Sequence, residues 1–295
     1  MKKRRYIICA PALSGSAGIR ALYVLRDELE AHGYDAWMFV FARKVKRMAS
    51  SRKQILKIDK ASQENDVVVY PETVWGNPLG FKHVVRWLLN KPGALGGSPR
   101  LARGELVFAY VPRYLPSAPC LRVDVIDRSM FYDAGRTRDV DATFVYKGGY
   151  VRETPELAGL FEITMSNPRT RQELAGLLQH TRTLYTHDAD SSLLIEALAC
   201  GVQVKVITKT GIADYQMPDP LFDRSLFEKQ LVEFIAQSQV MSTVKVSRVS
   251  LYLRKLMIPF NFAFLCLFAA LRRIHPSPWT RRWNGYLSQC VFLRP

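Results

Sequence analysis

Residues 234–295 contain neither aspartate nor glutamate, although they hold nine lysines and arginines. Residues 1–60 are also basic, with 14 lysines and arginines against 5 acidic residues, whereas the stretch between these ends holds 19 basic and 21 acidic residues. A chain with two basic ends and a neutral middle is expected to bind polyanions, either a nucleic acid or an anionic membrane. Composition alone does not choose between these two partners.

The five cysteines form neither a close pair nor a histidine-spaced cluster. This spacing argues against a disulfide framework and against a zinc site, and it is typical of reduced thiols in the cytosol. The apolar run after the basic N-terminus is cut short at Pro11, so we interpret it as a first strand and not as a signal peptide. The sequence shows no repeat of fixed period and no low-complexity tract.

Apolar runs alternate with amphipathic segments through most of the chain, which predicts an α/β protein with open parallel sheets. In the first part we expect strands at 6–13, 35–41, 66–72, 105–112 and 121–127, helices at 19–32 and 81–90, and a basic loop or short helix at 43–53. In the second part we expect strands at 142–150, 161–168, 181–186 and 202–207, with helices at 169–181 and within 187–201. The predicted domains are 1–135, 136–233 and a basic, apolar helical tail at 234–295.

The stretch HDADSSLLIEALACG, residues 187–201, lies between two of these expected strands. It predicts a loop and a helix, with Gly201 just past the last helical turn. Loops that enter helices at the carboxyl ends of parallel strands are where α/β proteins bind ligands. Asp188 and Glu196 are eight positions apart, and Ser191 and Ser192 are placed at the expected helix start, where free N–H groups favour a phosphate.

Four stretches together resemble bacterial glycosyltransferases of the two-Rossmann (GT-B) type that build lipopolysaccharide or capsule. They are APALSGSAGIRALYVLRDELEAHGYDAW, VVVYPETVWGNPLGFKHVVRWLLNKPG, FVYKGGY and MSNPRTRQELAGLLQHTRTLYTHDADSSLLIEALACGVQV, within residues 6–207. The resemblance implies two Rossmann-like parallel-sheet domains facing across a cleft, with the helical C-terminal tail outside the likeness. It implies a nucleotide-sugar donor as substrate, no separate cofactor, and a lipid-linked, lipopolysaccharide or capsule acceptor.

The same resemblance assigns roles to individual residues. A glutamate at the position of Glu196 binds the nucleotide ribose, and the acid at position 188 meets the donor sugar or its phosphate. Asp188 is one methylene shorter than the usual glutamate, which puts its reach in doubt. The acidic-x7-Glu spacing favours retention of the anomeric configuration only weakly. Asp188 and Asp190 also form a DxD, but the helix that follows fits the two-Rossmann interpretation better, so we expect no metal.

Without a metal, protein cations must neutralise the leaving diphosphate. Lys147, followed by Gly148, is the first candidate, and Arg169 and Arg171 are next. The SGSAG loop, with Gly15 and Ser16, is expected near the donor phosphate or the acceptor, or else is an ordinary tight turn. It is not GxGxxG, and the second strand does not end in an acid, so a nicotinamide enzyme is disfavoured.

Glu72 ends an expected buried strand, where it is either a general base on an acceptor hydroxyl or a hydrogen-bond partner of the turn at Gly76-Asn77. His83 is expected to be a surface or capping residue on the following helix. Cys200 is expected to be a small packed residue. The predicted catalytic residues are therefore Asp188 and Glu72.

The tail carries a run of sixteen uncharged residues at 256–271, short of the roughly 20 that a transmembrane helix needs. Two tryptophans and two arginines in SPWTRRWNGY favour peripheral contact with the inner face of the cytoplasmic membrane, the alternative being a helix that packs as core. The leading hypothesis is thus a glycosyltransferase at that face. The alternative is a non-catalytic basic α/β scaffold that binds a membrane or nucleic acid. Nucleic acid is disfavoured because the basic run at 43–53 has no aromatic residues.

Overall fold

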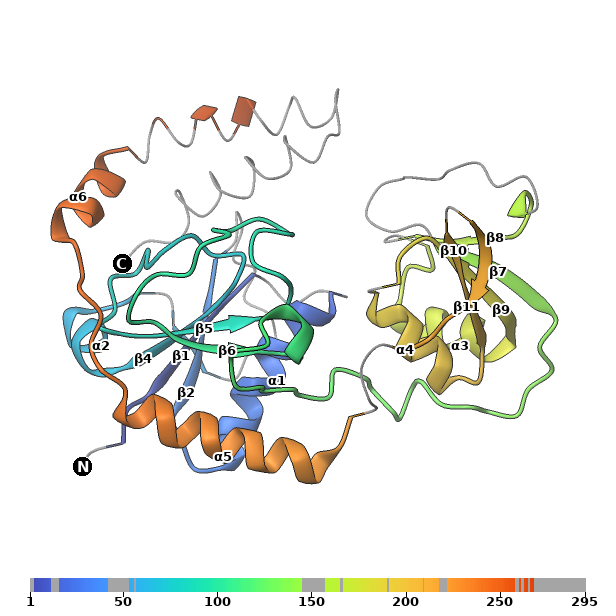
Figure 1. Cartoon of the computed structure of the whole chain (residues 1–295), viewed down its shortest axis with the longest axis horizontal. Helices are drawn as coiled ribbons and strands as arrows, with labels where there is room; N and C mark the ends of the chain where they lie inside the picture. The colour runs from blue at the N-terminus through green and yellow to red at the C-terminus, as the bar shows by residue number, and fades with distance from the viewer. Residues whose placement is uncertain are drawn as a thin grey trace. The chain divides into compact units, whose positions relative to one another are not determined.

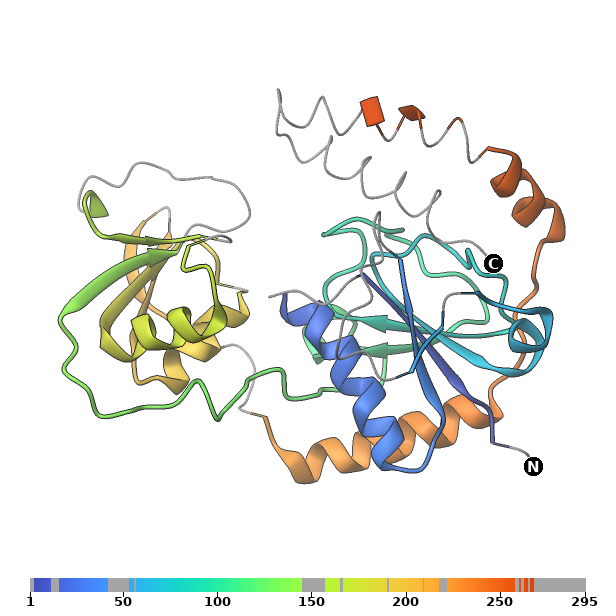
Figure 2. The ribbon, with the colours of Figure 1, turned by 180° about the vertical axis from the view of Figure 1, so that it is seen from behind.

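The computed structural model describes residues 3–11, 16–41, 53–55, 57–144, 157–164, 167–189, 191–208, 210–217, 222–257, 260, 263–264 and 266–267. The chain divides into two compact units, one formed by Met1–Asp124 with Leu221–Pro295 and the other by Val125–Pro220 (Figures 1 and 2). The sequence placed these divisions at 135/136 and 233/234. The second one falls earlier because α5 (Arg224–Val240) packs on the first unit, where Phe234 contacts the rings of Tyr6 and Phe108.

The first unit contains a six-stranded sheet in the order β3-β2-β1-β4-β5-β6. Its strands are β1 (Tyr6–Ala10), β2 (Ala36–Val40), β3 (Gln54–Ile55), β4 (Val67–Pro71), β5 (His83–Leu88) and β6 (Leu106–Ala109). Each neighbouring pair of strands is parallel. This is the strand order of doubly wound nucleotide-binding sheets. In such sheets the order of the strands reverses between the first and fourth strands, and ligands bind in the crevice at that point. The predicted α/β class is confirmed.

Helices cover one face of this sheet, and α1 (Ala17–Ala31) lies beside α5 on it (Figures 1 and 2). Arg224 of α5 forms an ion pair with Glu28 of α1 at 2.6 Å, and Glu228 pairs with His32 at 2.9 Å. The other face carries the short α2 (Lys60–Asn65) and an apolar cluster that includes Val68, Leu79 and Phe81. Both faces are therefore buried, as the uninterrupted apolar runs of β1 and β4 require.

The helix expected at 81–90 is wrong, because His83–Leu88 form β5, an interior strand of the sheet. All six residues are buried between β4 and β6, which satisfies their backbone groups on both sides. His83 is accordingly a buried strand residue and not a helix cap. The strand expected at 121–127 is also absent from these fully described residues. Pairing beyond β6 is limited there to a single bridge between Ala109 and Cys120, after the short 3-10 helix Pro112–Tyr114.

The second unit has a five-stranded sheet in the order β11-β10-β9-β7-β8. The strands are β7 (Val140–Phe144), β8 (Phe161–Ile163), β9 (Thr181–Thr186), β10 (Gln203–Thr208) and β11 (Gly211–Asp214). The first four are parallel, and β11 pairs with β10 in the antiparallel sense. Taken in chain order, this arrangement is the 2-1-3-4-5 order of flavodoxin-like sheets, whose switch point lies between the first and third strands. Here those strands are β7 and β9.

Two helices pack on this second sheet, α3 (Arg171–His180) and α4 (Ser192–Ala199). Their apolar faces share a core with the sheet, formed by residues that include Ala142, Leu178, Leu184, Leu194 and Ala197. Both helices were predicted from the sequence, as were the strands on either side of α4. The expectations for 43–52 and 145–150 lie outside the described residues.

Near the C-terminus, α6 (Arg248–Leu256) follows an extended segment that is tied to the first unit, because the N–H of Val244 donates to the carbonyl of Lys82 at 2.7 Å. Most of the 256–271 run lies outside the described residues. Within the part of the chain that is described, no helix is both long enough and apolar enough to cross a bilayer.

Candidate functional site

The first candidate site lies at the carboxyl end of β4, where the first sheet has its switch point. Glu72 directly follows β4, and its Oε2 accepts a hydrogen bond from the N–H of Leu89, just after β5, at 2.9 Å. Leu89 in turn lies against the first turn of α1, since a Cβ added to Gly18 would be 3.8 Å from the Leu89 Cβ. The ends of β4 and β5 and the start of α1 therefore meet around this carboxyl group.

Glu72 has an unusual proton affinity for a carboxylic acid. The residue is only 4% exposed, and burial raises the pKa of Glu72 from 4.5 to about 7, with the Leu89 N–H opposing the rise. A carboxyl group with a pKa near 7 gains and loses a proton at neutral pH, which is the property required of a general base. The backbone groups that hydrogen-bond this carboxyl are those of Leu89, Asn90 and Glu72 itself, whereas the alternative considered from the sequence was the turn at Gly76-Asn77.

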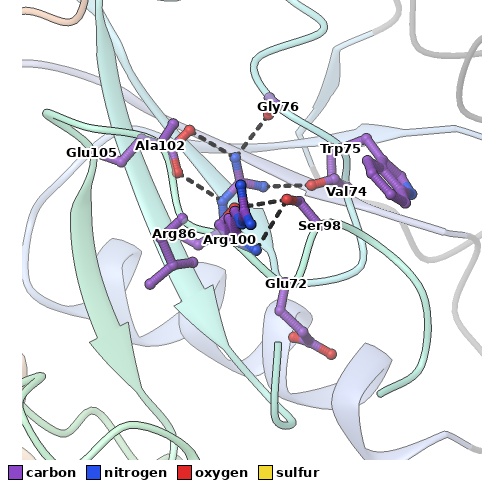
Figure 3. Close-up of a pocket in the computed structure, with 10 residues that line it drawn as sticks. Glu72, Val74, Trp75, Gly76, Arg86, Ser98, Arg100, Ala102 and Glu105 are labelled. Carbon is purple, nitrogen blue, oxygen red and sulfur yellow. Dashed lines mark hydrogen bonds and ion pairs between the residues drawn. The ribbon is translucent and has the colours of Figure 1, made fainter. Parts of the chain in front are cut away.

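A pocket of about 280 Å³ opens beside the same strand end (Figure 3). Its inner wall is the buried guanidinium of Arg86, which donates two hydrogen bonds to Glu105 at 2.9 and 3.0 Å. The other three donors reach the backbone carbonyls of Pro71, the last residue of β4, and of Val74 and Gly76 in the loop that follows. Because all five guanidinium hydrogens are used, Arg86 fixes that loop and has no donor left for a ligand.

The outer wall of the pocket comes from the loop between β5 and β6. Ser98, Arg100 and Leu101 line it, together with Trp75 from the loop between β4 and β5, and the Ser98 hydroxyl holds the Arg100 backbone through two hydrogen bonds of 2.7 and 3.1 Å. Glu72 also lines the pocket, with its side chain turned away from the Arg86 cluster (Figure 3). The sequence analysis missed this pocket, although an arginine inside the apolar run HVVRWL was a signal for a buried ion pair.

The start of α1 belongs to the same sheet edge. Ser16 is the N-cap residue of α1, with extended backbone angles, and its side chain does not cap the helix. The first turn of α1 holds no acidic residue, so the positive end of its dipole is not neutralised from within the helix. Gly15 lies outside the described residues.

The second candidate site is the switch point of the second sheet. The Thr186 hydroxyl, at the end of β9, donates to the carbonyl of Phe144 at the end of β7 at 3.4 Å and accepts from the N–H of Asp188 at 3.0 Å. This bridge places Asp188 at the carboxyl edge between β7 and β9, where the sequence predicted it. Lys147 and Gly148 follow β7 in the chain and lie outside the described residues.

The predicted serines start α4 at the same edge. Ser191 is the N-cap residue, whose hydroxyl accepts from the Leu193 N–H at 3.3 Å, and Ser192 is the first helical residue. Cys200 ends the helix and is fully buried, as expected, and burial raises the pKa of its thiol to about 11. Gly201 has φ +78, the left-handed conformation expected just past a helix.

Glu196 and Arg171 were both predicted as ligand-binding residues, and the structure brings them into direct contact. Arg171 donates to the two carboxylate oxygens of Glu196 at 2.7 and 2.8 Å, and its guanidinium lies 4.4 Å from the ring centroid of Phe131. The Glu196 side chain is 1% exposed and that of Arg171 is 29% exposed. The ribose-binding role of Glu196 stays a prediction, while in this structure the carboxylate orients Arg171. Arg169 is exposed, and its N–H joins the capping box of α3 through Glu173.

Among the residues that the structure describes, no group of three or more His, Cys, Asp and Glu side chains is placed to hold a metal ion. No protein-family model matches the chain, and a search of curated proteins found no match. The features of the chain that point to a function are therefore the two switch points and the groups placed at them.

Proposed function

We propose that the protein is a glycosyltransferase of the two-Rossmann (GT-B) type. It transfers a sugar from a nucleotide-sugar donor to a hydroxyl group of a lipid-linked or lipopolysaccharide acceptor, as a peripheral protein on the inner face of the cytoplasmic membrane. The observation that carries this proposal is Glu72, a buried carboxyl group at a switch point whose pKa of about 7 suits proton removal from an alcohol.

In this proposal the second unit binds the donor. Arg171, oriented by Glu196, supplies a fixed cation for the diphosphate, and the Ser191 and Ser192 end of α4 supplies backbone N–H groups. Asp188, at the end of β9, contacts the donor sugar. Lys147 and Gly148 complete the phosphate site in the family pattern.

In the reaction, the acceptor hydroxyl gives its proton to Glu72 as its oxygen bonds to the anomeric carbon. The bond from that carbon to the diphosphate breaks at the same time, and the nucleoside diphosphate leaves with its electron pair. Attack from the face opposite the leaving group inverts the anomeric centre. The structural support for Glu72 as base therefore favours inversion over the retention indicated by the acidic-x7-Glu spacing.

A second candidate function is a non-catalytic scaffold that binds a membrane. Apolar side chains exposed on α6, among them Val249 at 69% and Tyr252 at 63%, favour it. The two functions differ in turnover, because a scaffold neither transfers nor hydrolyses a nucleotide sugar.

The test is a thermal-shift screen of the full chain against nucleoside diphosphates and their sugar conjugates, followed by a transfer and hydrolysis assay with any compound that binds. A donor at a hundred times its dissociation constant stabilises the fold by about 2.7 kcal/mol and raises the melting temperature. Asp188→Asn is expected to weaken binding of the sugar conjugate more than that of the bare nucleotide. Glu72→Gln is expected to bind the donor normally and to lose transfer.

The matched control is Asp141→Asn, which changes a carboxylate in β7 that is paired with Arg182 near the amino end of the strand. It is expected to leave donor binding unchanged. Absence of binding to the whole panel, or full transfer by Glu72→Gln, would refute the proposed function.

A further inference from the structure

The C-terminal helix α6 presents a row of exposed apolar side chains. Val249, Tyr252 and Leu256 are three and four positions apart and are 69%, 63% and 52% exposed. The same spacing continues after α6 with Phe260, Phe264 and Leu267, which are 61%, 52% and 52% exposed. Residues three and four apart lie on one face of a helix, so Val249, Tyr252 and Leu256 form a single apolar face of α6. We call these three residues the outer face.

The opposite side of α6 is attached to the first unit. Leu251 is half-buried and packs against Gly80, where an added Cβ would lie 2.7 Å from the Leu251 Cδ1. The segment before the helix is held by the hydrogen bond from Val244 to Lys82. The helix is therefore fixed by one side while the outer face is left in contact with solvent, which is unusual for large apolar side chains that gather in one place.

The charge around the outer face indicates what covers it. Lys245 and Arg248 are exposed just before and at the start of α6, and residues 234–295 hold nine basic and no acidic side chains. Glu64 of α2 is close enough to Arg248 to interact with it electrostatically, but the segment 234–295 itself contains no acid. An apolar helix face beside cations in such a segment fits a surface that is apolar inside and anionic outside. A bilayer that contains anionic lipids has this chemistry.

We propose that the outer face of α6 docks the first unit onto an anionic lipid bilayer, with the helix lying in the plane of the headgroups. Val249, Tyr252 and Leu256 enter the boundary with the acyl chains, while Lys245 and Arg248 contact lipid phosphates. This inference names the surface through which the membrane association in the proposed function takes place. It does not depend on the transfer chemistry, because none of these residues belongs to either candidate site.

The test is flotation of the full chain with two kinds of vesicle. One is phosphatidylcholine alone and the other is phosphatidylcholine with phosphatidylglycerol at a molar ratio of about 2:1. The protein is expected to float with the anionic vesicles, to float much less with the neutral ones, and to be released by added salt. The triple variant Val249→Ser/Tyr252→Ser/Leu256→Ser is expected to lose about tenfold or more in partitioning.

The matched control is Leu226→Ser/Val232→Ser/Val240→Ser on α5, whose side chains are 49%, 59% and 71% exposed. It removes a similar apolar area from the same unit and is expected to float like the wild type. Lys245→Gln/Arg248→Gln is expected to weaken binding to anionic vesicles while leaving the melting temperature unchanged.

Equal flotation of the outer-face variant and the wild type overturns the proposal, as does failure of the wild type to bind anionic vesicles. The proposal is also overturned if neither protein floats and light scattering shows a wild-type dimer that the outer-face variant dissociates. Loss of flotation with normal donor binding leaves the proposed transfer activity untouched.

Discussion

The guanidinium of Arg171 donates to both carboxylate oxygens of Glu196, across 25 positions of sequence, and joins the start of α3 to the second turn of α4. The two partners differ in burial, because the Glu196 side chain is 1% exposed and the Arg171 side chain is 29% exposed. An ion pair with one buried and one accessible member responds unequally to the loss of either residue. The buried charge depends on its counterion, whereas the accessible one is partly solvated by water.

This asymmetry predicts that Arg171→Met destabilises the second unit more than Glu196→Gln. Loss of the guanidinium leaves the buried carboxylate without that counterion, at a cost of about 3 kcal/mol. Glu196→Gln keeps a hydrogen-bond acceptor beside a half-exposed arginine, so the expected cost is about 1 kcal/mol. Urea denaturation of both variants measures the difference. Arg182→Met, which breaks an ion pair that is 62% exposed on the arginine side, is the control and is expected to cost less than about 1 kcal/mol. Equal losses for the two main variants would contradict the asymmetry.

The raised pKa of Glu72 predicts a pH dependence of stability. Between pH 4.5 and about 7 the unfolded chain has released the Glu72 proton while the folded chain still holds it. The contribution of the Glu72 carboxyl group to the free energy of unfolding is therefore complete below pH 4.5. It is lost as the pH rises through about 7, which lowers the free energy of unfolding by about 3 kcal/mol. Glu72→Gln has no proton to release. The difference in free energy of unfolding between Glu72→Gln and the wild type is therefore expected to grow, in favour of the variant, by this amount between pH 4.5 and pH 8.

Urea denaturation at several pH values measures this difference, and other carboxylates cancel because both proteins contain them. Glu64→Gln is the control, since Glu64 is a partly exposed residue of α2 in an ion pair with Lys82 and its pKa is lowered. It is expected to show no such growth between pH 5 and pH 8. Parallel curves for wild type and Glu72→Gln would mean that Glu72 has no raised pKa.

The sequence predicted the sheet edge at which several candidate residues lie, but it mispredicted the strand β5. The positions of Asp188, Ser191 and Ser192 follow from the strand–helix–strand order alone, because chain order and the parallel sheet place them at the carboxyl edge. Residues 81–90 were predicted as a helix because the segment follows NPLG and ends at KPG, whereas the structure has the buried strand β5 at 83–88. Arg86 is accommodated there only because Glu105, 19 residues later, neutralises it. An arginine inside an apolar run indicates that a buried partner exists, but which residue is that partner is decided by tertiary packing.

The roles of single residues depended on contacts of the same long-range kind. Arg171 and Glu196 were each expected to contact a ligand, and nothing in their local sequence indicates that they bind each other. The assignment of α5 to the first unit likewise depends on Phe234 reaching Tyr6, more than 200 positions away. Local pattern thus predicts which edge of a sheet a residue occupies, while the side chain it contacts is decided by packing.

The close approach of Gly97 to the strand end that carries Glu72 leads to the last prediction. Gly97 has φ +73, and a Cβ added to it would lie 1.9 Å from the carbonyl oxygen of Glu72. Gly97→Ala is therefore expected to push the loop between β5 and β6 away from β4, at a cost of about 3 kcal/mol from the strained φ and the overlap together. Gly76→Ala is the matched control, because Gly76 has φ +59 with nothing within 4 Å of an added Cβ, and only the strain of about 1 kcal/mol applies. Urea denaturation of the two variants compares them directly. If both lose the same amount, the loop is free to move off Glu72, and the wall of the pocket is not fixed by this contact.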